Sequence, residues 1–386
     1  MILPITLRQP SNIEFGEGAR SKLAMHCTPY ERIFIVCDPA LVAVAHDITD
    51  SLQSQNIHIC SEVEPEPKIS TFESILKLAR LHNPEMFIAI GGGSTIDLAK
   101  LLSIVFDTDE TFRDIAGIDQ IQHKRNAGLI ALPTTSGTGS EVSPIAILTD
   151  TEQQLKIGAV SPELIPDVAI IDPNLTISMP SHLTAATGMD AMTHCIEAFT
   201  NRFAHPVVDC HAVEGIRHLG ANIVEACEHG DNIAVRTAMS LGSLYGGLCL
   251  GSINTAAVHA LAYPLGGEFG ISHGTANSLL LPYVMEFNVS CCIAKYAQIA
   301  RVLGCKQRAE KQLAYLAIDM IRELSRKCNI PEKIKDLGIK ANALEHMARS
   351  ALKVTRLLNN NPRTIKYDDA LEIYTHAYKG TSPKPV

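Results

Sequence analysis

An uncharged stretch of 31 residues, 237–267, is the feature that most limits how this chain can fold. Arg236 precedes it and Glu268 follows it. The stretch is long enough to cross a membrane as a helix, but a helix that is apolar all round is equally expected at the centre of a large helical domain. Because it contains His259 and Pro264, and because no second span is available to pack against it, we expect a buried core helix.

The size and the charge of the chain narrow its class. At 386 residues it exceeds the length at which a single hydrophobic core stops growing, so we expect two domains. Hydrophobic residues make up 46% of the sequence and charged residues 19%, which is typical of a well-packed soluble protein. The net charge of −8 argues against binding to nucleic acid or to an anionic membrane.

Eleven cysteines are scattered along the chain without the spacing of a metal site or a disulfide framework. No C-x-x-C motif occurs, and Cys291 and Cys292 are adjacent, which suits neither a normal disulfide nor a zinc site. The opening MILPITLRQP lacks the basic and apolar regions of a secretion signal. We therefore expect a cytoplasmic protein whose thiols are reduced.

The first half of the sequence alternates short apolar runs with helical patterns, as βαβ units do. The apolar runs are rich in Ile, Val, Leu or Phe, as strands buried on both faces should be. We expect strands at 32–38, 86–92, 128–135 and 167–173, and helices at 70–82 and 94–106, each with its opening serine or threonine as N-cap. After residue 178 helical periodicity dominates. The sequence thus predicts a doubly wound α/β domain over residues 1–178 and an all-helical domain over residues 179–386.

Two loops of the first half have the composition of a phosphate-binding site. Gly91, Gly92, Gly93 and Ser94 lie between a predicted strand and a predicted helix, where backbone N–H groups can hold a pyrophosphate. A tight turn is the alternative, and the G-x-G-x-x-G fingerprint is absent because Ile96 occupies its third glycine position.

Residues 134–140 are all Thr, Ser or Gly and follow another predicted strand, which favours a polar ligand over a flexible linker. At the end of the first predicted strand, Asp38 can accept hydrogen bonds from a ribose diol and would repel a 2′-phosphate. It can equally be a residue that starts a turn. The first of these two interpretations of Asp38 favours NAD over NADP.

Four residues of the second half form a candidate metal site. Asp190 and His194 are four positions apart within a helical pattern and therefore share a face. His259 lies in the uncharged stretch, where a polar group costs a few kcal/mol unless it is satisfied, and His273 follows after a glycine-rich turn. A carboxylate and three imidazoles suit a divalent transition metal. An ordinary ion pair and a buried, hydrogen-bonded histidine are the structural alternatives.

The chain resembles the iron-containing (group III) alcohol dehydrogenases essentially from end to end. The resemblance is carried by IEFGEGA, GGGSTIDLAK, LPTTSGTGSEV, the DPNL…MP segment, AATGMDAMTHCIEAF, the HALAYPLGG…HG block and LNNNPR. It implies a dehydroquinate synthase-like fold with an N-terminal dinucleotide-binding domain, a C-terminal helical domain and an active site in the cleft between them. It also implies a homo-oligomer, since members are commonly dimers or larger.

The resemblance assigns roles to individual positions. It implies that Asp190, His194, His259 and His273 bind the catalytic ion, usually Fe(II) and sometimes zinc. The positions that it places around NAD(P) are Gly91, Gly92, Gly93, Ser94, Asp97, Thr134, Thr135, Thr138 and Lys156.

One position departs from the family pattern. Many members carry a histidine one turn after the third ligand, and here that residue is Tyr263. A tyrosine can still pass a proton, although its reference pKa of about 10 makes it a poorer base at neutral pH. We assign Tyr263 and His273 to the catalytic centre.

The function predicted from these residues is reversible hydride transfer between NAD and a primary alcohol or aldehyde, with the metal as a Lewis acid on the substrate oxygen. Glycerol dehydrogenase and maleylacetate reductase are rival oxidoreductases. A dehydroquinate synthase-like lyase would need a cluster of basic residues for a substrate phosphate, and only Arg202, Arg217 and Arg236 are near in sequence. A non-catalytic nucleotide- or metal-binding protein is the remaining alternative.

Overall fold

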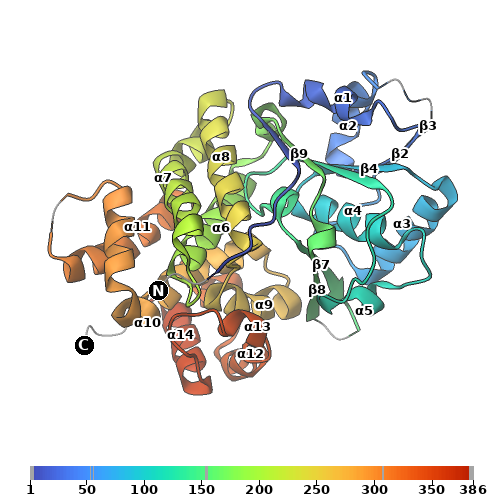
Figure 1. Ribbon diagram of the computed structural model, residues 1–386. Helices are drawn as coiled ribbons and strands as arrows, with labels where there is room; N and C mark the ends of the chain where they lie inside the picture. Colours follow the sequence, from blue (N-terminus) through green and yellow to red (C-terminus); the bar gives the residue numbers. More distant parts are fainter. Residues whose placement is uncertain (1–3, 53, 55, 153–154, 307, 382–386) are drawn as a thin grey trace. The chain divides into compact units, whose positions relative to one another are not determined.

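A computed structural model describes residues 4–52, 54, 56–152, 155–306 and 308–381 (Figure 1). The chain divides into two compact units, one formed by Leu7–Ser178 and the other by Met179–Val386 together with Met1–Thr6. The first unit contains every strand of the described chain and the second consists of helices. The predicted fold class is therefore confirmed.

The α/β unit is built on a six-stranded parallel sheet with the order β1-β9-β6-β4-β2-β3. Its strands are β1 (Asn12–Phe15), β2 (Arg32–Cys37), β3 (Asn56–Cys60), β4 (Met86–Gly91), β6 (Gly128–Pro133) and β9 (Val168–Ile171). The four predicted strands are confirmed as β2, β4, β6 and β9. The edge strands β1 and β3 were not predicted, because more polar segments form them.

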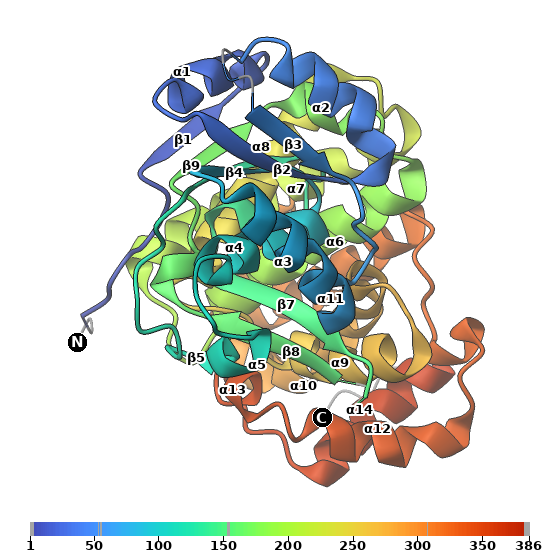
Figure 2. The same ribbon diagram turned by 90° about the vertical axis from the view of Figure 1, so that its right-hand side faces the viewer.

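Helices cover both faces of this sheet, which explains why its central strands are almost entirely apolar. The helices are α1 (Leu23–Cys27), α2 (Val42–Thr49), α3 (Ile69–His82) and α4 (Gly93–Val105). Ile33 and Ile35 of β2 point to the core shared with α1 and α2, whereas Phe34 and Val36 point to the core shared with α3 and α4. Figure 2 shows α3 and α4 on their side of the sheet.

The predicted N-caps of α3 and α4 are wrong. The two helices begin one residue earlier than predicted, and their N-cap positions are Lys68 and Gly92, neither of which makes a side-chain capping bond. Gly92 is extended and follows β4 directly, so the helix begins at Gly93. The hydroxyl of Ser94 instead accepts a hydrogen bond from the backbone N–H of Glu66 at 3.1 Å.

A second, small sheet of the α/β unit was also not predicted. It has the order β5-β8-β7, with β5 (Gly117–Ile118), β7 (Ile145–Asp150) and β8 (Leu155–Val160), and the short helix α5 (Phe112–Ile115) precedes it. β7 and β8 pair antiparallel and directly follow the Thr/Ser/Gly loop. The sheet places Lys156 opposite Thr149.

The second unit contains helices joined by loops, with no strand among its described residues. Its helices are α6 (Ser181–Thr200), α7 (Pro206–Glu228), α8 (Ile233–Leu250), α9 (Ala257–Phe269), α10 (His273–Val302), α11 (Glu310–Lys327), α12 (Leu344–Ala351), α13 (Thr355–Leu358) and α14 (Tyr367–Lys379). α6 is central, because it contacts α7, α8, α9 and α10. Sixteen of its twenty residues are buried.

The uncharged stretch forms most of α8 and all but the end of α9. Among the described residues, α8 is the one helix whose length and composition would suit a membrane span. However, 61% of its residues are buried, and it packs against α6 and α7. That arrangement is typical of a core helix in a large helical domain.

Amide side chains fix the connection between α8 and α9. Asn201, at the end of α6, donates to the backbone oxygens of Ile253 at 3.3 Å and Asn254 at 3.2 Å. Asn360 of the LNNNPR motif donates to the backbone oxygen of Thr255 at 2.8 Å. Segments far apart in the sequence therefore hold the start of α9 in place.

Candidate functional site

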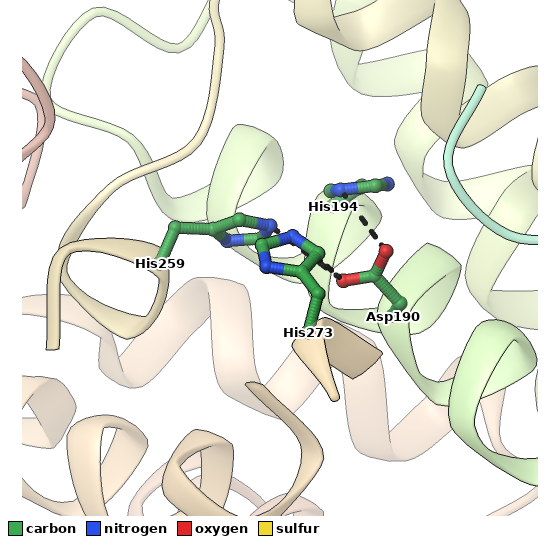
Figure 3. A group of neighbouring side chains, drawn as sticks. All are labelled: Asp190, His194, His259 and His273. Carbon is green, nitrogen blue, oxygen red and sulfur yellow. Dashed lines mark ion pairs between the residues drawn. The ribbon is translucent and has the colours of Figure 1, made fainter. Parts of the chain in front are cut away.

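Four side chains from three helices of the helical unit converge on one point (Figure 3). α6 carries Asp190 and His194, α9 carries His259, and His273 is the first residue of α10. One ligand atom from each residue lies within 4.8 Å of those of the other three. The carboxylate of Asp190 lies 3.7 Å from Nε2 of His194, 3.6 Å from Nε2 of His259 and 3.7 Å from Nε2 of His273.

The local sequence explains how α9 and α10 bring their histidines together. α9 ends at Gly270, which has φ of 66° and so adopts the left-handed conformation that glycine tolerates best. Three residues later, His273 begins α10. A Cβ on Gly274 would lie only 2.3 Å from the backbone oxygen of Ala186, so the start of α10 contacts the backbone of α6 directly. A larger residue would separate the helices that carry the ligands.

The electrostatics of this cluster favour an ionised Asp190. Burial acts to raise the pKa of its carboxyl group, but the positive charge that His194, His273 and His259 can carry, together with a hydrogen bond from Asn277, outweighs burial and lowers that pKa. The rings of His194 and His259 are stacked, with centroids 4.9 Å apart. A buried carboxylate among imidazoles is a site of negative charge for a cation.

Two further polar residues contact the cluster, and neither was predicted from the sequence. Glu197 on α6 contacts Nδ1 of His259 through Oε2 at 2.6 Å. Asn277 on α10 donates to Oδ1 of Asp190 at 2.7 Å and contacts Nε2 of His273 at 3.1 Å. Helical spacing was the available signal, because Glu197 follows Asp190 by seven residues and Asn277 follows His273 by four.

The residues present fit a divalent transition metal. One carboxylate and three imidazoles are donors that such ions accept. Nε2 of His259 is buried and has no hydrogen-bond partner among the described residues, which is costly unless something else satisfies it. An ion at the point of convergence would meet that requirement.

In the α/β unit, the order of the parallel sheet defines where a ligand is expected. The chain runs from β2 outward to β3 on one side, and from β4 to β6 and β9 on the other. Ligands of such sheets bind at the carboxyl ends of the strands where the order reverses. Asp38 follows β2, and Gly91 ends β4, so these residues flank that point. The backbone N–H of Asp38 donates to the oxygen of Ile90 at 3.0 Å.

The glycine turn and the Thr/Ser/Gly loop pack against each other at this edge. Thr134 follows β6, and its backbone N–H donates to the oxygen of Gly91 at 3.0 Å. A Cβ on Gly92 would lie 3.2 Å from Thr135, and one on Gly93 would lie 2.7 Å from Thr138. The structure thus brings together the two loops whose composition suggested a phosphate-binding site.

Asp97 lies beneath the loop rather than in open solvent. Its carboxylate accepts hydrogen bonds from the hydroxyl of Ser140 and from the backbone N–H of Ile147 at 2.9 Å. Burial raises the pKa of Asp97, against the opposing charge of Lys100. Lys100 is fully buried, donates to the Ser140 hydroxyl at 2.8 Å, and has a pKa lowered to about 8 by burial.

The remaining predicted residues occupy distinct positions. Asp38 starts a turn, as one of its two interpretations required, because its Oδ1 accepts from the backbone N–H of Ala40 at 2.9 Å. Lys156 forms an ion pair with Glu66 at 2.9 Å. Since the N–H of Glu66 donates to Ser94, this pair is linked to the glycine turn.

Tyr263 lies one turn after His259 on α9 and is partly buried against the helical core.

Family models match both halves of the chain. Residues 10–173 match the family model described as iron-containing alcohol dehydrogenase, and residues 184–378 match its C-terminal counterpart, the Fe-containing alcohol dehydrogenase family, C-terminal.

Relatives of this family match nearly the full chain. Long-chain-alcohol dehydrogenase 1 of Geobacillus thermodenitrificans is 36% identical over 363 residues, which cover 92% of this chain and 91% of the relative. The 1,3-propanediol dehydrogenase of Citrobacter freundii is 33% identical over 374 residues, which cover 94% and 96%. A crystal structure of 1,3-propanediol oxidoreductase superposes with a TM-score of 0.93 at 32% identity and covers 97% of this chain and 100% of that chain.

The resemblance stated from the sequence motifs is therefore confirmed. Because family models match both units and the relatives are similar over nearly their whole length, the chain belongs to the iron-containing alcohol dehydrogenase family, as an oxidoreductase of alcohols and aldehydes.

Proposed function

We propose that this enzyme transfers hydride reversibly between NAD and a primary alcohol or its aldehyde, at a divalent ion held by Asp190, His194, His259 and His273. In the oxidative direction the alcohol and NAD⁺ give the aldehyde, NADH and one proton. The observation that carries the proposal is the convergence of these four side chains within 4.8 Å. A bound ion there would supply Lewis-acid stabilisation of negative charge on the substrate oxygen.

The protein contributes to this chemistry by holding the donor groups in fixed positions. The carboxylate of Asp190 and the imidazoles of α6, α9 and α10 supply donors from rigid helices, which keeps the site preorganised. We propose Fe(II) as the ion, with zinc as the alternative. Imidazole nitrogens accept either metal, so the donor set does not choose between them.

His273 and Tyr263 are the proposed residues on the substrate side. The side chain of His273 is 29% exposed, whereas those of Asp190, His194 and His259 are at most 6% exposed. Among the ligands, His273 is thus the one that solvent or substrate reaches. The hydroxyl of Tyr263, one turn after His259, is proposed to pass the released proton outward.

NAD is proposed to bind at the carboxyl edge of the parallel sheet. Backbone groups of Gly91–Ser94 and side chains of Thr134, Thr135 and Thr138 would face the pyrophosphate. Asp97 and Lys156 would position these loops rather than contact NAD directly, because their carboxylate and ammonium groups already contact protein partners. Asp38, beyond β2, would accept the ribose hydroxyls and disfavour a 2′-phosphate.

A phosphate-eliminating lyase is less compatible with the helical unit. Arg236 is 2% exposed and donates to the oxygens of Gly230, Thr184 and Met179, so its guanidinium is engaged in the fold. Arg217 pairs with a neighbouring glutamate in its own helix. Arg236 is therefore not available as part of a basic cluster for a substrate phosphate.

The cellular setting and the assembly state remain predictions from sequence and family. We propose a cytoplasmic homo-oligomer that acts on a small alcohol or aldehyde. All eleven cysteines are free, which is compatible with a reducing compartment.

His259→Ala tests the proposed function. We expect the variant to lose both bound metal, measured by elemental analysis, and NAD-linked oxidation of short primary alcohols, measured by NADH absorbance. His346→Ala, which removes an exposed histidine outside the cluster, is the matched control and should keep both. Full turnover of His259→Ala in the presence of a chelator would contradict the mechanism. Cofactor binding by the wild type without turnover of any alcohol or aldehyde would favour a binding protein.

A further inference from the structure

We propose that Glu197 is a positioning residue that fixes the tautomer of His259, so that Nε2 presents its lone pair to the ion. The inference rests on the proposed metal site and adds a residue to it. Glu197 is not one of the four ligands, but it lies on the same helix, α6, as two of them. If Asp190 is position i, His194 is i+4 and Glu197 is i+7. One helix thereby supplies two ligands and the group that orients a third.

The contacts of Glu197 define the geometry. Its Oε1 accepts a hydrogen bond from the backbone N–H of Val258 at 2.6 Å, and its Oε2 lies 2.6 Å from Nδ1 of His259. Glu197 and His259 are each only 4% exposed. The carboxylate therefore contacts two consecutive residues, Val258 and His259, in the first turn of α9, where burial excludes competing water.

The direction of these hydrogen bonds assigns the proton. A backbone N–H can only donate, so Oε1 is an acceptor and the plane of the carboxylate is set. Because Oε2 of the same carboxylate is also an acceptor, the contact is a hydrogen bond only if Nδ1 of His259 carries the proton and donates it. A neutral imidazole with its proton on Nδ1 carries its lone pair on Nε2, which is the form that binds a metal.

The other nitrogen of His259 agrees with this assignment. Nε2 points toward the cluster, 3.6 Å from Oδ1 of Asp190, and has no hydrogen-bond partner among the described residues. The opposite tautomer would leave two acceptors facing each other at 2.6 Å on the Glu197 side. It would also direct an N–H at the position of the ion.

Glu197→Gln is the informative substitution, because glutamine keeps the shape and removes the second acceptor. With its oxygen on Val258, its amide N–H₂ would face Nδ1 of His259 and favour the wrong tautomer. We expect the affinity of the metal-free protein for Co(II) and Zn(II) to fall about 10- to 100-fold, as for other groups that orient metal-bound histidines. The visible absorption of the Co(II) form should also change.

Thr193→Ala is the matched control. Thr193 is fully buried on the same helix, and its hydroxyl donates to the backbone of Met189 rather than to a ligand. We expect Thr193→Ala to lose stability while its Co(II) affinity and absorption remain those of the wild type. Glu197→Asp, which keeps a carboxylate one methylene shorter, should restore part of the affinity lost in Glu197→Gln.

The nitrogen chemical shifts of His259 test the assignment without any change at Glu197. In the metal-free wild type, ¹⁵N spectra should show a protonated Nδ1 and an unprotonated Nε2, with the signals identified by their loss in His259→Ala. A protonated Nε2, or wild-type Co(II) affinity and absorption in Glu197→Gln, would overturn the role of Glu197 and leave the metal site standing. Failure of the wild type to bind any divalent metal would instead overturn the proposed function itself.

Discussion

Gly93 and Thr138 approach each other so closely that a Cβ on Gly93 would lie 2.7 Å from Cγ2 of Thr138. Gly93 is the first residue of α4, and Thr138 belongs to the loop after β6. The contact therefore joins the two segments proposed to hold the pyrophosphate. It makes the shape of that edge sensitive to a single methyl group.

Gly93→Ala is expected to weaken NADH binding about tenfold or more, because overpacking at such a contact costs roughly 1–3 kcal/mol and displaces the loop. Metal content should not change. NADH fluorescence titration measures the affinity. Gly158→Ala is the control, since its Cβ would meet the nearest atoms at an ordinary 3.7 Å. Unchanged NADH affinity in Gly93→Ala would separate this turn from the cofactor.

Asp38→Asn is expected to relax the preference for NAD. Asparagine retains an oxygen that can accept from the N–H of Ala40, so the turn should persist while the negative charge is removed. We expect the ratio of kcat/KM for NADP to that for NAD to rise by about tenfold, a change of about 1.4 kcal/mol. Steady-state kinetics with both cofactors measure it. An unaltered ratio would place the ribose elsewhere.

Gly274→Ala is expected to disturb the metal centre from outside it. The added Cβ would lie 2.3 Å from the backbone oxygen of Ala186, which no side-chain rotation relieves, so α10 must move away from α6. Both thermal stability and Zn(II) affinity should fall, because His273 moves with α10. Thr275→Ala, a change in the same turn without that clash, should keep its Zn(II) affinity. Normal affinity in Gly274→Ala would mean that α10 shifts without moving its ligand.

Glu141 should give stability an unusual dependence on pH. Burial raises the pKa of this carboxyl group from 4.5 to about 7, although a backbone hydrogen bond and the charge of Lys100 oppose the rise. Its contribution to the free energy of unfolding is therefore fully present below pH 4.5 and is lost as the pH rises through about 7. At 1.36 kcal/mol per pKa unit the loss is on the order of 3 kcal/mol.

Glu141→Gln removes this titration and is the test of it. The variant should match the wild type near pH 4.5 and be more stable than the wild type near pH 7.5. Urea unfolding of both proteins at the two pH values measures the difference. A difference in unfolding free energy that stays constant with pH would show that folding does not change the pKa of Glu141.

Local patterns in the sequence predicted much of the fold, because each of those patterns reflects burial in a single element. The strands β2, β4, β6 and β9 were recognisable, since strands buried on both faces are continuously apolar. The N-caps of α3 and α4 were predicted wrongly, because the helices begin right after Lys68 and Gly92, and neither residue makes a side-chain capping bond. The small sheet β5-β8-β7 has half-exposed strands and left no comparable signal.

The sequence by itself determined which residues had the chemistry for a metal site, because ligand types and helical spacing are local properties. Only the tertiary structure decided that Asp190, His194, His259 and His273 meet, since three helices must cross at one point. It alone paired Glu197 with His259, 62 residues apart, and Lys100 with Ser140. Such pairs depend on how elements pack, and packing is a property of the whole folded chain rather than of any segment.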